Sequence, residues 1–302
     1  PISLHEPIVR RYAAQYGFDN QDSPIPVGQF RRFAFFENAL TAPDQLRQVT
    51  AYALTQLFVV SQTGVLGNNP LGLSSYYDTL LTHSFGNYRD LLRAVTLHPA
   101  MGFYLSHVNN GKTDPDANTF PDENYAREVM QLFTIGIYEL NPDGTQKLDT
   151  DGRPIPTYDN TDIREFSKIF TGLAYAGADG QEPQFGRNRA VLHAPMVMFD
   201  GYHEQGEKYL LNEFVVPDGQ TGFQDIDDAV DNLFNHPNVG PFVGKQMIQR
   251  LVSSNPSPEY VSRISAVFAD NGNGVRGDMQ AVIRAILTDP EVADASRVRE
   301  PF

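Results

Sequence analysis

The chain has 302 residues and a formal net charge of −14, and 41% of its residues are hydrophobic. The absence of cysteine excludes a disulfide framework, a thiol nucleophile and a thiolate-bound metal. The acidic balance argues against a nucleic-acid partner, which needs clustered lysine and arginine, and no apolar run is long enough to span a bilayer.

The first forty residues mix proline, glycine and aromatic side chains. We interpret residues 1–40 as an N-terminal arm that packs its aromatic residues on the body of the protein. Helical spacing of apolar residues begins at Thr41, which suits an N-cap, and we expect a single α-rich domain over residues 41–302. The first residues hold neither an initiator methionine nor a signal segment, so we expect a processed or trimmed chain.

Helices are predicted where apolar residues recur at helical spacing between Pro, Gly, Asn or Asp signals. They cover residues 41–61, 74–82, 88–97, 100–107, 121–135, 162–173, 225–234, 241–252, 258–270 and 277–288. Turn signals and alternating segments predict a small β-hairpin or meander around 137–160 and strands around 190–217, the latter within a non-helical insertion at about 174–223. The fold class expected is therefore mainly α, a compact multi-helix domain with a small β insertion.

The fifth predicted helix carries a polar ladder of Asn124, Arg127, Glu128 and Gln131, with Glu123 at its edge. At about 100° per residue, these side chains share one arc of the helix. The ladder faces water, forms an internally satisfied buried network or lines a site, and the sequence leaves these alternatives open. As a site, it offers Glu128 and Glu123 as catalytic carboxylates and the other three residues as substrate ligands. As a structural hub, it pairs Arg127 with Glu128 and ties the helix to its neighbours.

A non-helical segment gathers an imidazole, an amine and several carboxylates within nine residues. The members are Asp200, His203, Glu204, Glu207 and Lys208. Loops on a helical scaffold often hold acid–base or metal-binding groups, which makes His203 and Lys208 catalytic candidates. The competing interpretation is a solvated turn with a Glu–Lys pair. A hydrolase would require His203 to meet Glu123 or Glu128 in one cleft.

Four acidic or amide residues are spaced like alternate ligands of a calcium loop. They are Asp114, Asp116, Asn118 and Asp122. The sixth position holds Thr119 where such a loop needs glycine, and the twelfth holds Tyr125 where it needs glutamate, so the segment is not an EF-hand. A looser site for calcium or another divalent cation is the only cofactor that the sequence predicts.

Histidines lie beside two helix boundaries. His98-Pro99 and His236-Pro237 predict that a histidine closes a helix end before a turn that proline starts. His98 and His107 are nine positions apart, so one helix would point them to different faces and they cannot jointly bind one metal.

Several motifs occur in an order typical of one bacterial family. They are Tyr76-Tyr77-Asp78, Phe85 to Leu92, His98 to Met101, Pro121 to Gly136, His236 to Val239 and Val282 to Leu287. On these motifs the chain resembles the domain-of-unknown-function family 1800, most specifically in Glu123-Asn124-Tyr125-Ala126-Arg127-Glu128 followed by Gln131-Leu132-Phe133. His203, Gly206 and Lys208 also match the family pattern. Family members commonly continue beyond both ends of this chain.

That resemblance implies an exported, mostly helical protein, often encoded beside a second exported family. It brings no accepted activity, so no catalytic residue is carried over. The sequence also contains no G-x-S-x-G elbow, P-loop, G-x-G-x-x-G or H-E-x-x-H motif.

Two functions follow from these observations. The first is an exported, periplasmic or extracellular helical module that binds a partner or assembles at the cell envelope. Its partner would be another exported protein or an extracellular polymer. The alternative is a carboxylate- and histidine-dependent hydrolase or lyase, with or without a divalent metal, acting on an extracellular polymer.

Overall fold

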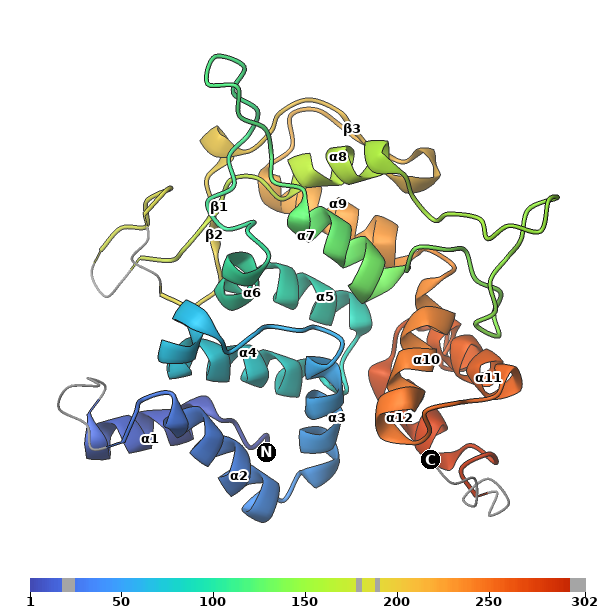
Figure 1. Ribbon diagram of the computed structural model, residues 1–302, viewed down its shortest axis with the longest axis horizontal. Helices are drawn as coiled ribbons and strands as arrows, with labels where there is room; N and C mark the ends of the chain where they lie inside the picture. The colour runs from blue at the N-terminus through green and yellow to red at the C-terminus, as the bar shows by residue number, and fades with distance from the viewer. Residues whose placement is uncertain (18–24, 178–180, 188–190, 294–302) are drawn as a thin grey trace.

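Helices form most of the structure, a computed structural model that describes residues 1–17, 25–177, 181–187 and 191–293. The α-helices are α1 (Glu6–Tyr16), α2 (Gln29–Thr41), α3 (Gln45–Thr55), α4 (Pro70–His83), α5 (Tyr88–Thr96), α6 (Pro99–Tyr104), α7 (Asn124–Glu128), α8 (Asn160–Ile169), α9 (Gly222–Phe234), α10 (Val239–Leu251), α11 (Pro258–Ala269) and α12 (Met279–Thr288) (Figure 1). Shorter helical turns are η1 (Gly64–Asn68), η2 (Val129–Thr134), η3 (Asp200–Tyr202) and η4 (Leu211–Glu213). The strands are β1 (Leu173–Ala174), β2 (Val197–Met198), β3 (Lys208–Tyr209) and β4 (Val215–Val216). The mainly α fold class is confirmed.

Side-chain caps explain where many of these helices begin. Asn87, Ser257 and Asp278 accept hydrogen bonds from the first backbone N–H groups of α5, α11 and α12. Asp159 and Thr221 form reciprocal capping boxes at the starts of α8 and α9. Such caps satisfy N–H groups that have no partner inside the helix, so local sequence sets these boundaries.

The N-terminal segment, expected as an arm, consists largely of helices α1 and α2. These helices bury their own small apolar cluster, which includes Val9, Phe30 and Ala34, and both contact α4. The backbone N–H groups of His5 and Glu6 donate to the carboxylate of Asp78 on α4 at 2.7 and 2.8 Å. This anchor attaches the start of the chain to the body.

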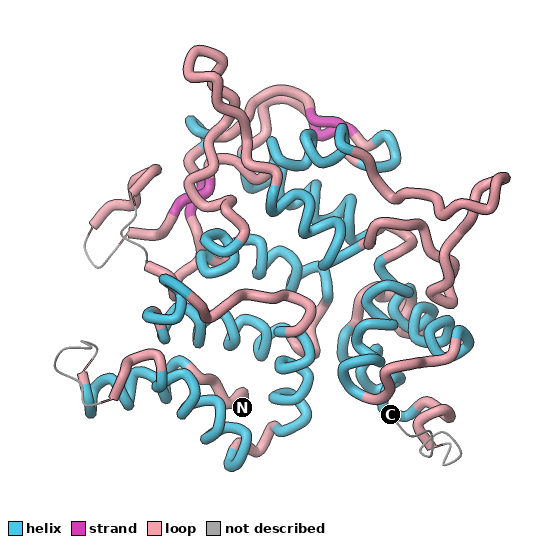
Figure 2. The backbone as a smooth tube through the Cα atoms, in the orientation of Figure 1, coloured by secondary structure: helices cyan, strands magenta, loops and turns pink. Residues whose placement is uncertain are grey.

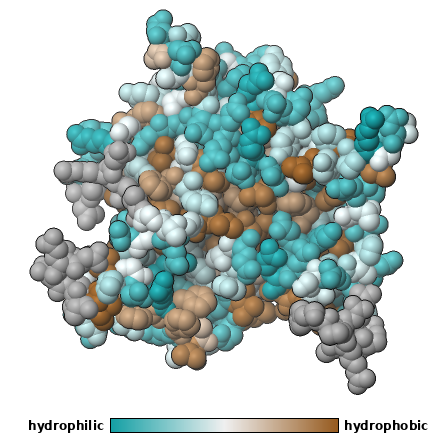
Figure 3. All heavy atoms as spheres, viewed as in Figure 1, coloured by the Kyte–Doolittle hydropathy of each residue, from teal (hydrophilic) through white to brown (hydrophobic). Residues whose placement is uncertain are grey.

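The main core is one apolar cluster that runs from α3 to α12. Its large buried aromatic residues have satisfied polar ends: the hydroxyl of Tyr88 donates to Phe133 O and that of Tyr260 to Ile286 O, each at 2.6 Å. On the face shown in Figure 3, apolar residues gather near the middle and hydrophilic residues predominate at the periphery. Within the described ranges, no helix is long and apolar enough to cross a membrane.

The β structure is sparser than predicted, as Figure 2 shows by its short magenta segments. Residues 137–160 form turns joined by single β-bridges and contain no strand of the two small sheets. β1 pairs with β2 and β3 pairs with β4, both antiparallel. The strand expected over 209–216 is interrupted by η4, where Asn212 and Glu213 have φ of 58° and 59°.

Candidate functional site

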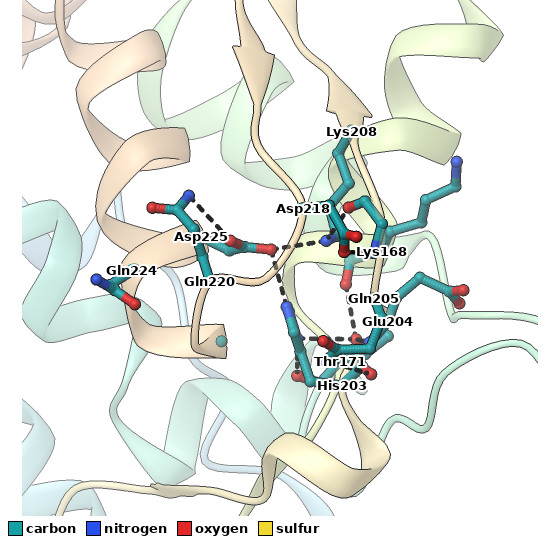
Figure 4. Close-up of polar contacts among 12 residues, drawn as sticks. Lys168, Thr171, His203, Glu204, Gln205, Lys208, Asp218, Gln220, Gln224 and Asp225 are labelled. Atoms are coloured by element: carbon teal, nitrogen blue, oxygen red, sulfur yellow. Dashed lines mark hydrogen bonds and ion pairs between the residues drawn. The ribbon is translucent and has the colours of Figure 1, made fainter.

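Three elements bring His203, Lys208 and Asp225 together inside the protein (Figure 4). His203 directly follows η3, Lys208 begins β3, and Asp225 lies in the first turn of α9. Oδ2 of Asp225 lies 2.7 Å from Lys208 Nζ and 2.9 Å from His203 Nε2. One carboxylate oxygen thus serves both basic side chains.

The remaining polar atoms of this trio are also occupied. Nδ1 of His203 lies 3.0 Å from the carbonyl oxygen of Thr171, and Lys208 Nζ donates to Gly206 O at 3.0 Å. Both ring nitrogens of His203 therefore have a polar partner inside the protein. Gln220 Nε2 donates to the second oxygen of Asp225 at 3.2 Å.

Burial closes the trio to solvent. His203 is 0% exposed, Asp225 1% and Lys208 2%. Burial alone would raise the pKa of the Asp225 carboxyl, but hydrogen bonds from His203 and Lys208 hold that pKa below its usual value. The arrangement stabilises the meeting of a loop, a strand and a helix, and gives a substrate no route to the imidazole.

The acidic residues around the trio hold loop backbone in place. Oε2 of Glu204 accepts from Thr113 N at 2.7 Å, and Oδ1 of Asp200 accepts from Gly222 N at 2.8 Å. Glu207 accepts from the hydroxyl of Tyr209. The solvated Glu–Lys turn considered from the sequence is wrong, because Lys208 is buried and its ion-pair partner is a residue of α9.

The polar ladder lies largely at the surface and is not a buried hub. Arg127 pairs with Glu123 at 3.4 Å, with 42% and 41% of these side chains exposed, so the expected pairing with Glu128 is wrong. Asn124 is exposed, and Gln131 makes only a long contact of 3.5 Å with the hydroxyl of Tyr158. His203 and Lys208 contact Asp225 and not the ladder, so the two groups of candidates do not form one site.

The backbone changes from α-helix to π-helix directly after Glu128. In η2, Thr134 Oγ1 donates to Val129 O at 2.5 Å, and the N–H groups of Ile135 and Gly136 both donate to Met130 O. Single π-turns are rare and often accompany functional sites. Glu128 is half-buried, and no hydrogen bond or ion pair links its carboxylate to the described part of the chain.

The histidines of the two His-Pro pairs were expected to close a helix end before a turn, but each instead accepts a backbone N–H group on the side of the helix that follows it. His98 is the N-cap of α6, and its Nδ1 accepts from Ala100 N at 3.1 Å. His236 Nδ1 accepts from Asn238 N at 3.1 Å. His107 is buried, with its ring centroid 3.9 Å from that of Tyr125, and its Nε2 lies 2.9 Å from the carbonyl oxygen of Thr96.

The predicted calcium loop caps its own turns. Oδ1 of Asp114 accepts from the N–H groups of Asp116 and Ala117 at 3.0 and 3.1 Å, and Oδ1 of Asp122 accepts from Asn124 N at 2.7 Å. Across the described residues, no three His, Asp or Glu side chains are grouped so that they could hold a metal ion. The structure gives the calcium prediction no support.

An open recess of about 400 Å³ lies where α2 contacts α3 and α4. Aromatic side chains and two arginines, Arg31 and Arg32, line it. The aromatic residues of the first forty positions were expected to pack on the body of the protein, whereas these two arginines were not predicted to border a site. A run of Arg-Arg followed by Phe-x-Phe-Phe was the available signal, and only the packing of α2 on α3 shows that it borders a hollow.

A family model described as "Protein of unknown function (DUF1800)" matches residues 19–302. The chain matches no curated protein and no solved structure.

Proposed function

Because this chain belongs to the DUF1800 family, described as being of unknown function, we propose from its geometry that it is an exported binding domain. The observation that carries this proposal is the closed trio of His203, Lys208 and Asp225. His203 and Lys208 were acid–base candidates from the sequence, and with Asp225 they are almost wholly buried and occupied by one another. Their contacts hold a loop, a strand and a helix together.

Two further features support a binding role. The formal net charge of −14 suits a protein that stays dissolved until it meets its partner. The recess between α2 and α3 is of the size that small-molecule sites have in proteins. The partner class we propose at the level of the whole domain is another exported protein or an extracellular polymer, met in the periplasm or outside the cell.

One observation favours the competing function, a hydrolase or lyase. Glu128 is half-buried, unpaired within the described residues and adjacent to the π-turn, while Glu123 lies five residues earlier, at the N-cap of α7. Such an enzyme would have to act through these two carboxylates without His203. A divalent metal would need ligands other than a cluster of the described acidic and histidine side chains.

A substrate panel separates the two functions. The purified chain is incubated with glycoside, ester and peptide polymers, and product release is compared with that of Glu128→Gln and Glu123→Gln variants. A binding domain releases no product from any substrate. Turnover by the wild type that Glu128→Gln abolishes would overturn the binding proposal. Fractionation of the producing cells tests export, and recovery only from the cytoplasm would contradict it.

A further inference from the structure

The recess between α2, α3 and α4 has the chemistry of a ligand site. In Figure 1 these helices lie together at the N-terminal end of the fold, and α2 contacts both neighbours. The main recess is about 400 Å³, and a second of about 230 Å³ adjoins it through shared lining residues Arg31, Arg32 and Gln62. Together they are large enough for a small organic molecule.

Aromatic rings form one side of the main recess. Phe35 is tilted against Tyr52, with ring centroids 5.9 Å apart, and meets Phe36 edge-on at 5.6 Å. Tyr77 lies at the buried end, stacked on His5 at 4.3 Å. Phe36 and Tyr52 are 61% and 52% exposed, although large aromatic side chains are usually buried. A planar apolar group placed among these rings would cover them.

Positive charge forms the other side. Arg31 is half-buried, and Nη1 donates only to the neutral Oε1 of Gln62, at 2.9 Å. Arg32 makes a long contact of 3.4 Å with Gln29. No carboxylate of the described residues lies within ion-pair distance of either guanidinium, although the chain carries a net charge of −14. Burial, together with the neighbouring charge of Arg32, lowers the pKa of Arg31.

His5, which also lines the recess, adds no charge at neutral pH. Burial lowers the pKa of His5 to about 4, and its Nε2 already contacts Oε1 of Gln48 at 3.2 Å. Among the residues that the structure describes, no acidic side chain lines either hollow. This part of the recess is therefore cationic and aromatic, and two arginines with no carboxylate partner among the described residues favour an anion.

We propose that this pocket binds a small organic anion, one that joins a carboxylate or phosphate head to a planar aromatic body. The head contacts Arg31 and Arg32, and the body packs on Phe36, Tyr52 and Tyr77. The inference deepens the proposed binding function, on which it rests, by naming the ligand class. The carboxylate and phosphate heads share one chemistry, and the test separates them.

Calorimetric titration with four probes tests the proposal. The probes are 2-naphthoate, 2-naphthyl phosphate, the neutral 2-naphthalenemethanol and inorganic phosphate. We expect saturable binding of at least one naphthyl anion, and the tighter one identifies the head group. The neutral alcohol and inorganic phosphate should each bind at least about tenfold more weakly, since a hydrogen bond to a charged group or a stacked ring is lost.

Variants locate the binding. Arg31→Gln should weaken the anion at least about tenfold, and Tyr52→Ala, at a half-exposed ring, about three- to tenfold. Arg153→Gln is the matched control, because Arg153 forms an exposed ion pair far along the chain and should leave the affinity unchanged. If Arg31→Gln does not fold, Tyr52→Ala still decides the question.

Three results would overturn the pocket: no saturable binding of either anion, equal affinity for the neutral alcohol, or affinities that Arg31→Gln and Tyr52→Ala leave unchanged. None of these bears on the substrate panel. Turnover that depends on Glu128 would overturn the binding function and leave the pocket standing, whereas failure of the naphthyl anions alone removes only the pocket.

Discussion

Lys208 and Asp225 form an ion pair with 2.7 Å between Nζ and Oδ2, and only 2% of either side chain is exposed. Burial removes water from both charges, so each charged group depends on the other for electrostatic stabilisation. His203 shares the same carboxylate oxygen, which makes Asp225 the centre of the network. Removing one partner leaves a buried charge without compensation.

Lys208→Met should therefore destabilise the protein by about 3–5 kcal/mol, because the carboxylate of Asp225 would keep only His203 and Gln220. Chemical denaturation measures the loss. The matched control is Arg153→Met, which breaks an ion pair with 76% and 66% of its side chains exposed and should change stability by less than about 1 kcal/mol. If the two substitutions lowered the free energy of unfolding equally, the buried ion pair would contribute no more stability than an exposed one.

Glycine at position 277 is required by both its backbone and its surroundings. Its φ is +71°, and an added Cβ would lie 2.5 Å from Cε2 of Phe234. Gly274 has φ of +78°, and nothing lies within 4 Å of an added Cβ. An alanine at either position would have the same unfavourable positive φ, but only alanine at position 277 would clash with a side chain.

Gly277→Ala should cost about 1–3 kcal/mol more than Gly274→Ala, because the ring of Phe234 must move within a packed core. Urea unfolding of the two variants gives the difference directly. Similar midpoints for both would mean that Phe234 moves aside freely.

Helix boundaries could be predicted because local chemistry sets them. Ser257-Pro258 starts α11 at the predicted residue 258. α9 was predicted from residue 225 but begins at Gly222, because the capping box of Thr221 and Gln224 was missed although it lies within four residues. α2 was missed because its apolar positions alternate with arginines and exposed phenylalanines, which blurs the helical period that its buried Phe30 and Ala34 follow.

The site could not be predicted to the same extent. His203 and Lys208 were identified as unusual, but their partner Asp225 lies on a later helix, and sequence spacing carries no information about that contact. The Arg127 pairing was wrong because neighbours in sequence point to different sides of a helix, whereas Glu123, four residues earlier, lies on the same side.

Two arginines of α5 form ion pairs with two aspartates of α9. Arg89 Nε lies 2.6 Å from Asp231 Oδ1, and Arg93 Nε lies 2.6 Å from Asp227 Oδ1. These side chains are partly exposed, so water and salt screen them. Arg93→Gln should cost about 0.5–1 kcal/mol in low salt, and most of that loss should disappear in 1 M NaCl, where the screening length is about 3 Å. A loss that is independent of salt would indicate that packing, not charge, is the cause.

Acid should unfold the protein through its buried histidines. Burial lowers the pKa of His5 to about 4, of His98 to about 3 and of His107 to about 4, each from a usual value of 6.5. Below pH 6.5 these histidines are protonated in the unfolded chain but stay neutral in the folded chain. The free energy of unfolding therefore decreases as the pH falls toward 4. Asp78 acts in the opposite direction, because burial raises its pKa to about 7 from 3.8 and the folded state binds the extra proton.

Near pH 5 the three histidines together take up almost three protons on unfolding and Asp78 releases about one, so the net uptake is about two protons, or roughly 3 kcal/mol of stability lost per pH unit. Denaturant titrations at several pH values measure this slope. His98→Asn keeps a side-chain acceptor for the N-cap of α6 and should reduce the slope by about one proton. Asp78→Asn should steepen it by about one proton, since the opposing group is gone. Stability that is flat or rising on acidification would show that these histidines are hydrated in the folded protein.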